Sequence, residues 1–312
     1  MNLESSNLPI FNDEENVYES LPSHYSFHIH MAAGALAGIV EHCVMFPVDS
    51  VKTRMQSLYP SPKATYKSVP EALYKIVRHE GIKRPFRGVS VTLIGAGPAH
   101  AFYFSIYEKV KRSISGTETG GQSPVAQIAA GCLATIFHDA WMNPAETIKQ
   151  RLQIYNSQHS RAFPCFISIC KNEGIKAFYR SYTTQLSMNI PFHCVHLVAY
   201  EYSQELLNPN RQYNPTTHMA SGAIGGAVAS AITTPLDVCK TLLNTQDPRT
   251  LKVSKQARIN GFFHAIGTIY QCCGIKGYFN GLQARVIYSI PSTALSWLAY
   301  ESFKAFLKSE SN

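Results

Sequence analysis

The sequence predicts an all-α integral membrane protein in which six helices form three related repeats. Three observations lead to this fold class. A set of motifs recurs three times at intervals of about one hundred residues. Only 15% of the 312 residues are charged, against about 25% in an ordinary soluble chain. The basic residues are also confined to particular segments, as expected when they lie on one side of a membrane.

The first repeated motif has the form Pro-x-acid-x-x-Lys. It begins at Pro47, Pro144 and Pro235, and a glycine lies 13 residues before each of these prolines. Because a proline inside a helix removes a backbone hydrogen bond, it bends the helix. The constant spacing indicates a rigid helical segment with a bend near its end in every repeat.

The second repeated block begins with Gly-Ile-Lys, at Gly81, Gly174 and Gly274, and a Tyr-Glu pair ends 27 residues after each glycine. The distance from the motif proline to this glycine varies between 34, 30 and 39 residues, which indicates rigid elements joined by a variable connector. The N-terminal stretch is acidic and has no Lys or Arg, so it is not an Arg-rich presequence. The predicted segments are a disordered stretch and three repeats: 1–24, 25–114, 122–208 and 213–308.

Each repeat is expected to contribute two weakly polar helices. If they extend beyond the motif prolines, they exceed the roughly 20 residues that cross a bilayer about 30 Å thick. Small residues four apart, at Gly34/Gly38 and Gly222/Gly226, favour close packing in lipid. The alternative, a soluble helical solenoid, would carry more charge. The predicted helices cover 31–46, 89–107, 125–142, 182–200, 219–234 and 283–300.

The positive charge is concentrated between the two helices of each repeat. These connectors (52–87, 149–180 and 240–285) hold nine, six and seven of the 28 Lys and Arg residues. Such placement is the positive-inside pattern, and it puts both termini on the side opposite the connectors. The net charge of +8 therefore fits contact with anionic lipid better than binding to nucleic acid.

The composition excludes other classes. A hydrophobic share of 45% with 11% aromatic residues excludes a disordered chain. The eight Cys residues are irregularly spaced and form no Cys-x-x-Cys motif, so neither a zinc site nor a disulfide framework is expected. The chain has no Gly-rich phosphate loop and no recognisable Ser/His/Asp spacing, which argues against an enzyme.

These motifs resemble the mitochondrial carrier family over about residues 25–308. The resemblance implies six tilted transmembrane helices in three pseudo-symmetric repeats, with short matrix helices. It implies a monomer that crosses the mitochondrial inner membrane several times and has both termini toward the intermembrane space. Such a protein alternates access between cytosol and matrix and needs no cofactor. Anionic inner-membrane lipid such as cardiolipin is the expected partner of the connectors, and no nucleic acid is expected.

The resemblance also implies a ring of ion pairs that closes the matrix side. Its pairs are Asp49–Lys149, Glu146–Lys240 and Asp237–Lys52. As isolated surface pairs they would each contribute only about 0–1 kcal/mol. In a narrow, partly desolvated pore they should contribute more, although they must still break during transport.

A second ring on the cytosolic side departs from the family pattern. By analogy its pairs are Lys111–Glu301, Glu201–Lys304 and Glu108–Gln204. Because Gln204 stands where the family has Lys or Arg, the last pair is only a hydrogen bond, and we predict a weak cytosolic gate. Two smaller departures lie in the third connector. Cys273 replaces an acid before its glycine, and Leu242 stands where the other repeats have Arg54 and Arg151.

The family's substrate contact points lie just before the proline of each second helix. In this chain they are Gly95, Ala96, Met188, Asn189, Tyr288 and Ser289. None of them is Lys or Arg, although a nucleotide, phosphate or di-acid would need cationic partners at this depth. The path is therefore expected to hold almost no fixed positive charge, which argues against an anionic substrate.

Histidines gather along the same helices instead. His42 and His100 lie near prolines of the first repeat, and His218 lies near the expected cytosolic mouth. Imidazole is the commonest neutral metal ligand, and a path of weak ligands suits a labile divalent ion. For His138, His193 and His196, packing within the helices is the favoured interpretation.

Three strings, at 95–101, 138–146 and 188–192, resemble the mitoferrin branch of the family. That branch carries iron into the matrix for haem and iron–sulfur cluster synthesis. The resemblance implies transport of Fe(II) along His42, His100 and the Met188/Asn189 pair, with His218 as a transient ligand at the mouth. A neutral or cationic organic cofactor is the alternative substrate. A non-transporting scaffold is less favoured, because a scaffold needs no breakable ring.

Overall fold

The computed structural model describes residues 27–58, 65–115, 124–155, 157, 159–209, 214–246, 251, 258–292 and 295. The segment 1–24, predicted to be disordered, lies outside the described residues, as does the end of the last predicted helix. Every regular element in the described part of the chain is helical. The predicted all-α fold class is confirmed.

The long helices extend well beyond the predicted ranges. They are α1 (Phe27–Met55), α3 (Val89–Ser115), α4 (Pro124–Gln153), α6 (Tyr182–Leu207) and α7 (Pro215–Thr245), and residues 282–292 begin a sixth. Helices α1, α4 and α7 have 29, 30 and 31 residues and continue through their motif prolines. At 1.5 Å per residue each is about 45 Å long. This exceeds the hydrocarbon thickness of a bilayer, which a helix accommodates by tilting or kinking.

Each connector contains a short helix followed by a turn. The short helices are α2 (Val69–Glu80), α5 (Ala162–Asn172) and α9 (Phe262–Cys273). The glycine of each Gly-Ile-Lys motif follows and has a positive φ, at Gly81 (97°), Gly174 (80°) and Gly274 (60°). A residue with a side chain rarely adopts this conformation. The repeated glycine therefore ends the short helix and turns the chain into a 3-10 segment: η3 (Arg84–Phe86), η4 (Ile175–Tyr179) and η5 (Ile275–Phe279).

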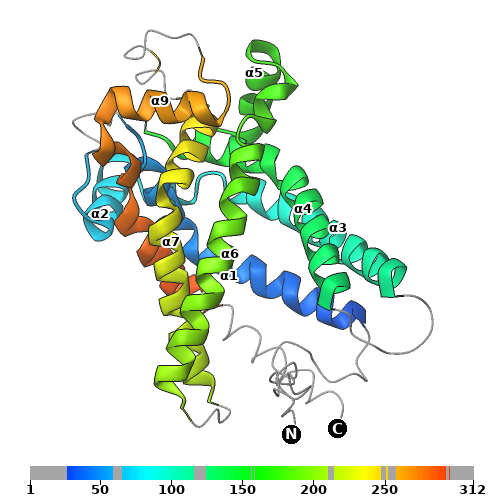
Figure 1. The fold of residues 1–312 in the computed structure, drawn as a ribbon. Helices are drawn as coiled ribbons and strands as arrows, with labels where there is room; N and C mark the ends of the chain where they lie inside the picture. The colour runs from blue at the N-terminus through cyan, green and yellow to red at the C-terminus, as the bar shows by residue number, and fades with distance from the viewer. Residues whose placement is uncertain are drawn as a thin grey trace, which may run out of the picture.

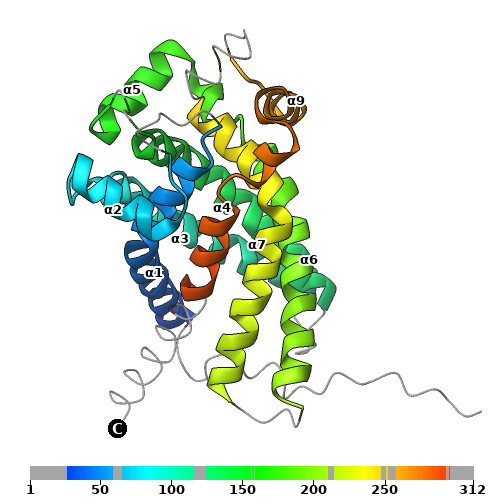
Figure 2. The same ribbon diagram turned by 90° about the vertical axis from the view of Figure 1, so that its left-hand side faces the viewer.

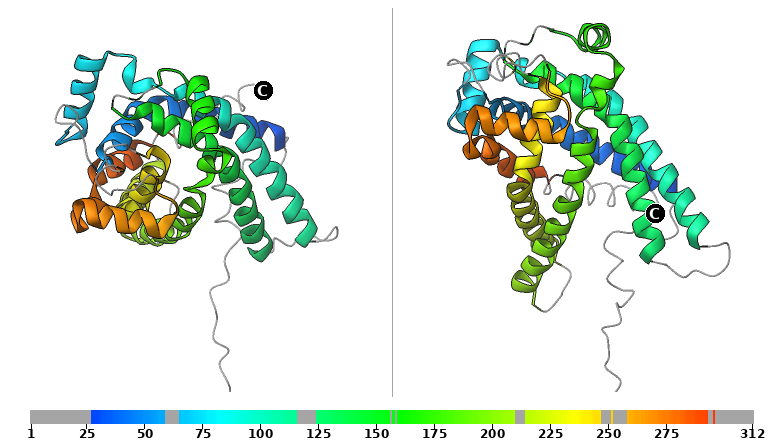
Figure 3. Two further views of the ribbon diagram at one scale, coloured as in Figure 1. Left: turned by 90° about the horizontal axis from the view of Figure 1, so that it is seen from above. Right: turned by 45° about the horizontal axis from the view of Figure 1, so that its top comes forward.

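The long helices converge at the connector end and separate away from it. Helices α2, α5 and α9 gather at the top of Figure 1, while the α3–α4 and α6–α7 pairs diverge below them. Turning the molecule shows the same convergence, with α1 near the start of the last helix (Figure 2). Within each pair the two helices pack side by side, as seen from the connector end (Figure 3).

The apolar core is divided into three clusters at the connector end, one for each repeat. Val51 packs with Ile76, Leu152 packs with Ile169, and Leu243 packs with Ile269. In each case the end of a long helix is fixed to the connector helix of its own repeat. Each cluster therefore anchors the charged end of its own long helix, α1, α4 or α7.

Farther along the helices, large apolar side chains face outward. Ile94 is 76% exposed and Ile190 is 71% exposed, whereas Thr233 and Ser221 are buried. This inside-out distribution suits a protein surrounded by lipid. Two helical stretches of the described chain, Arg84–Tyr107 and Thr216–Thr245, are long and apolar enough to cross a membrane by composition alone.

Candidate functional site

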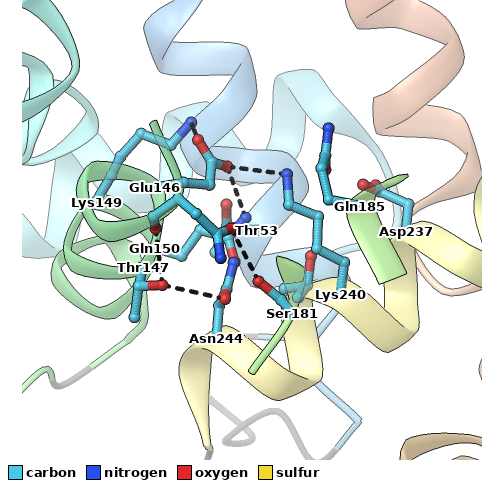
Figure 4. A network of polar contacts seen from close by, with 12 residues as sticks. Thr53, Glu146, Thr147, Lys149, Gln150, Ser181, Gln185, Asp237, Lys240 and Asn244 are labelled. Atoms are coloured by element: carbon cyan, nitrogen blue, oxygen red, sulfur yellow. Dashed lines mark hydrogen bonds and ion pairs between the residues drawn. The ribbon is translucent and has the colours of Figure 1, made fainter. Parts of the chain in front are cut away.

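The six charged motif residues meet at the connector end. Lys149 Nζ lies 3.2 Å from Asp49, Lys52 Nζ lies 2.9 Å from Asp237, and Lys240 Nζ lies 3.7 Å from Glu146. Each pair joins two different repeats, so the three pairs form a ring. Glu146 also lies 2.9 Å from Lys149 of its own helix (Figure 4). The carboxylates and amines are largely shielded from solvent.

Amide side chains support this ring, and they were not foreseen from the sequence. Gln153 donates to Asp49 (3.0 Å) and Gln56 donates to Asp237 (2.6 Å). The Gln153 amide oxygen accepts a hydrogen bond from Thr53 of α1, and the Gln56 amide oxygen accepts one from Thr241 of α7. Asn244, the third-repeat equivalent, is shorter and accepts from Thr147 instead (3.2 Å; Figure 4). All three amides lie nine residues after the motif proline, and this spacing was the signal available in the sequence.

Arg285 is a second residue that sequence reasoning missed. Its guanidinium lies 3.4 Å from Asp237 and donates to the carbonyl (3.0 Å) and hydroxyl (2.7 Å) oxygens of Thr233. The same group lies 3.6 Å from Met188 Sδ. A fixed cation therefore touches one predicted contact point. This corrects the expectation of a path almost free of positive charge. The nearby Asp237 carboxylate partly offsets the charge of Arg285.

The predicted contact points differ in what they offer to a solute. An added Cβ at Gly95 would lie 3.0 Å from Ala145, and Ala96 is buried, so these two residues pack against their surroundings. Met188 is buried beside Arg285. Asn189 is part-buried and donates to Asp139 of α4 (2.6 Å).

The last two contact points lie on the sixth long helix. Ser289 donates to a carbonyl of its own helix (2.9 Å). Tyr288 lies close enough to Asp49 and Lys149 to interact with them electrostatically. Tyr288 therefore lies near the charged ring.

Two of the three predicted metal-binding histidines lie near each other. The rings of His100 of α3 and His138 of α4 have centroids 5.4 Å apart, and His42 of α1 lies within electrostatic range of His100. In the part of the chain that the structure describes, no three His, Cys, Asp or Glu side chains are placed to hold one ion. Within the described residues, these imidazoles therefore belong to no closed three-residue cluster.

His218, the third predicted ligand, lies at the diverging end of the helices. Its Nδ1 lies 2.6 Å from the Tyr200 hydroxyl and 2.8 Å from Gln204 Nε2. Gln204 therefore contacts α7 in this structure. Its predicted partner, the Glu108 side chain, lies outside the described residues, as do the side chains of Lys111, Glu301 and Lys304. Glu201 is described and is exposed.

The connectors are fastened by partly buried Arg–Glu pairs in two repeats. Arg54 Nη2 donates to Glu80 (2.9 Å), and Arg151 Nη2 donates to Glu173 (3.1 Å). Burial raises the pKa of each of these two carboxyls, but their hydrogen bonds to arginine outweigh burial and hold the pKa below its usual range.

In the third repeat, Leu242 and Cys273 occupy the positions of the arginine and the glutamate. Leu242 belongs to the apolar cluster there, and Cys273 packs against that cluster. Both members of the ion pair are therefore replaced together by an apolar contact.

Repeated helix pairs with outward apolar faces, which converge on a ring of ion pairs, define a membrane solute carrier. The family model described as "Mitochondrial carrier protein" matches the chain three times, at residues 23–118, 120–211 and 211–311. The chain belongs to the mitochondrial carrier family, and it is a protein of the mitochondrial inner membrane.

Its relatives include named mitoferrins. The chain is 56% identical to Mitoferrin-1 of Danio rerio over 301 residues, which cover 96% of this chain and 90% of the relative. It is 57% identical to Mitoferrin-2 of Homo sapiens over 288 residues, with 92% and 79% covered. It is 42% identical to Mitochondrial RNA-splicing protein MRS4 of Saccharomyces cerevisiae over 295 residues, with 94% and 96% covered.

Proposed function

We propose that this chain carries iron, as Fe(II), from the intermembrane space to the matrix by alternating access, for haem and iron–sulfur cluster synthesis. The observation that carries the proposal is the group of imidazoles on α1, α3 and α4, which lies between the diverging end of the helices and the ion-pair ring. Similarity to mitoferrins over more than nine tenths of the chain supports the same substrate.

The ring is proposed as the matrix gate. In this conformation its three pairs are formed while the helices diverge at the other end. An ion would enter from the diverging end, exchange between weak ligands, and leave once the ring opens. Closure at the cytosolic end would then depend on the predicted second ring, in which Gln204 provides no charge.

The remaining features of the proposal come from the resemblance to the carrier family. The carrier works as a monomer, without a resident cofactor and without enzymatic activity, and both termini face the intermembrane space. The basic connectors face the matrix and anionic lipid such as cardiolipin. Several connector arginines are already bound inside the protein, including Arg87 to the carbonyl of His159 and Arg180 to Glu173. This supports a structural role for them over nucleic-acid binding.

A competition experiment tests the substrate class. The purified chain is reconstituted in liposomes, and Fe(II) uptake is measured with excess Mn(II) or with a bulky organic cation. We expect Mn(II) to block uptake, because it binds the same nitrogen and oxygen ligands. Inhibition by the organic cation alone would favour an organic cofactor as substrate. The absence of transport of either substrate would favour a scaffold.

A further inference from the structure

Helix α4 carries an imidazole and a carboxylate next to each other inside the membrane-spanning part of the fold. The His138 side chain is 26% exposed and that of Asp139 is 12% exposed. They lie six and five residues before Pro144. Ionisable side chains at this depth are costly and generally serve a function. Neither residue belongs to the ion-pair ring.

Contacts fix the orientation of this imidazole. His138 Nδ1 lies 3.2 Å from Asp139 Oδ1. A carboxylate only accepts hydrogen bonds, so this contact is made when Nδ1 carries the proton, and in the neutral imidazole Nε2 then holds the lone pair. Asp139 is held in turn by Asn189 of α6 (2.6 Å), which accepts from Gln185 (3.1 Å). A histidine oriented by a carboxylate in this way is the usual arrangement of a metal ligand and its supporting partner.

A second imidazole lies at a suitable distance. The centroids of His100 and His138 are 5.4 Å apart. Two imidazoles that bind one ion at about 2.1 Å with a near-tetrahedral angle would have centroids about 5.3 Å apart. His42 lies within electrostatic range of the same His100 ring.

The positions on α4 have a counterpart in the first repeat. Glu41 and His42 lie six and five residues before Pro47, so both repeats place one acid and one imidazole at the same depth. The Glu41 carboxylate accepts a hydrogen bond from Ser292 of the sixth long helix. In the third repeat the equivalent positions hold Ala229 and Ser230.

We propose that His138 is a further ligand for the transported metal ion, sharing it with His100, and that Asp139 is the residue that positions His138. Asp139 and Glu41 together supply the negative charge that offsets a divalent cation in this low-dielectric region. The inference rests on the proposed function, and it reverses the packing role expected for His138. Asn189 then acts through Asp139 and is not itself a ligand.

Binding of Co(II) to the purified full-length chain, followed by its visible absorption, tests this site without requiring transport. We expect His138→Ala to weaken Co(II) binding about tenfold or more. We expect Asp139→Asn to weaken it by about tenfold, in line with other supporting partners of metal-bound histidine, whereas Asp139→Glu recovers most of the affinity. Ser230→Ala, at the equivalent position of the third repeat, should bind like the wild type. The melting temperature of each variant, measured in parallel, identifies variants that fail to fold. If His138→Ala or Asp139→Asn fails to fold, the Co(II) affinity of Asp139→Glu decides the result.

The outcomes separate this inference from the proposed function. Wild-type Co(II) affinity in a folded His138→Ala variant overturns the inference, even if iron transport is found. Absence of Co(II) binding by the wild type also overturns it. If Co(II) binding depends on His138 and Asp139 but liposomes take up no Fe(II), the site stands and the proposed function fails.

Discussion

The ion-pair ring lies on α1, α4 and α7 and the imidazole region on α1, α3 and α4, and the two regions are built in opposite ways. In the ring, acids and amines are paired directly across repeats and supported by amides, as Asp237 is by Lys52, Arg285 and Gln56. In the imidazole region, His42 and His100 are linked by no short contact to each other. Because each acid of the ring has several partners, the ring should open only when all three ion pairs break together. Separate weak ligands in the imidazole region would instead allow an ion to move from one ligand to the next.

The largest effect should come from removing the weak ligands. We expect His42→Ala combined with His100→Ala to reduce Fe(II) uptake into liposomes at least tenfold, because two of the few nitrogen ligands on the path are lost. The ring should remain intact, so thermal stability should change little. His79→Ala, on the exposed face of α2, is the matched control. Wild-type uptake by the double variant would contradict the proposed path.

Breaking the ring should instead act on stability. Asp237→Asn leaves Lys52 and Arg285 without their common counter-charge, and removing one partner of a buried pair costs about 3–5 kcal/mol. Lys240→Ala should cost less, because its pair is longer (3.7 Å) and Glu146 keeps Lys149. Thermal unfolding of the purified variants measures both. If Lys240→Ala lowered the stability as much as Asp237→Asn, or more, Asp237 would not be the main counter-charge of the ring.

A smaller effect is expected at the opposite end. Gln204→Lys restores the charge that the family pattern places there and should strengthen the cytosolic ring. Fe(II) uptake should then slow by several-fold, because opening to the cytosol becomes harder. Gln204→Met removes the contact with His218 without adding charge, and it controls for loss of that contact. An unchanged rate in Gln204→Lys would refute a weak cytosolic gate.

The smallest effect concerns the connectors that hold the ring in place. The pKa of Glu80 is held below its usual range by Arg54, so the ionised carboxyl stabilises the fold at any pH above its unfolded pKa of about 4.3. This contribution is lost as the pH falls through the folded value.

Glu80→Gln should therefore lower the melting temperature by a few degrees at pH 7 and have no effect in strong acid. The third repeat lacks this ion pair, so Cys273→Ser should show no such pH dependence. Melting curves recorded from pH 7 down into strong acid provide the comparison. A difference between Glu80→Gln and the wild type that persists in strong acid would contradict this account of the connector.

Much of the fold follows from spacing alone. The motif prolines, the connector glycines and the Tyr-Glu pairs located the long helices and the connectors, because helix geometry makes such distances rigid. The helix ends were underestimated, because the predicted ranges stop before the motif prolines and α1, α4 and α7 continue through them. In the structure the charged residues after Pro47 and Pro144 continue the helices and form ion pairs with residues of neighbouring long helices.

The site was harder to predict, because its contacts join repeats. The pairing order in the ring came from the family resemblance, and distances between the motif residues accord with it. Gln56 and Gln153 were missed, since a glutamine near the end of a helix has no distinctive sequence signal unless the three repeats are aligned. Arg285 was missed because it lies one helical turn from the contact points. The link from Asp139 to Asn189 was missed because these two residues are 50 positions apart in the sequence.

The most direct test of the account is net Fe(II) uptake by the purified chain in liposomes that contain a trapped iron chelator. We predict uptake that rises with time, saturates with Fe(II) concentration and falls to the level of protein-free liposomes in the His42→Ala/His100→Ala variant. Uptake no faster than in protein-free liposomes, from wild-type protein shown to be folded, would contradict the claim that this carrier moves iron.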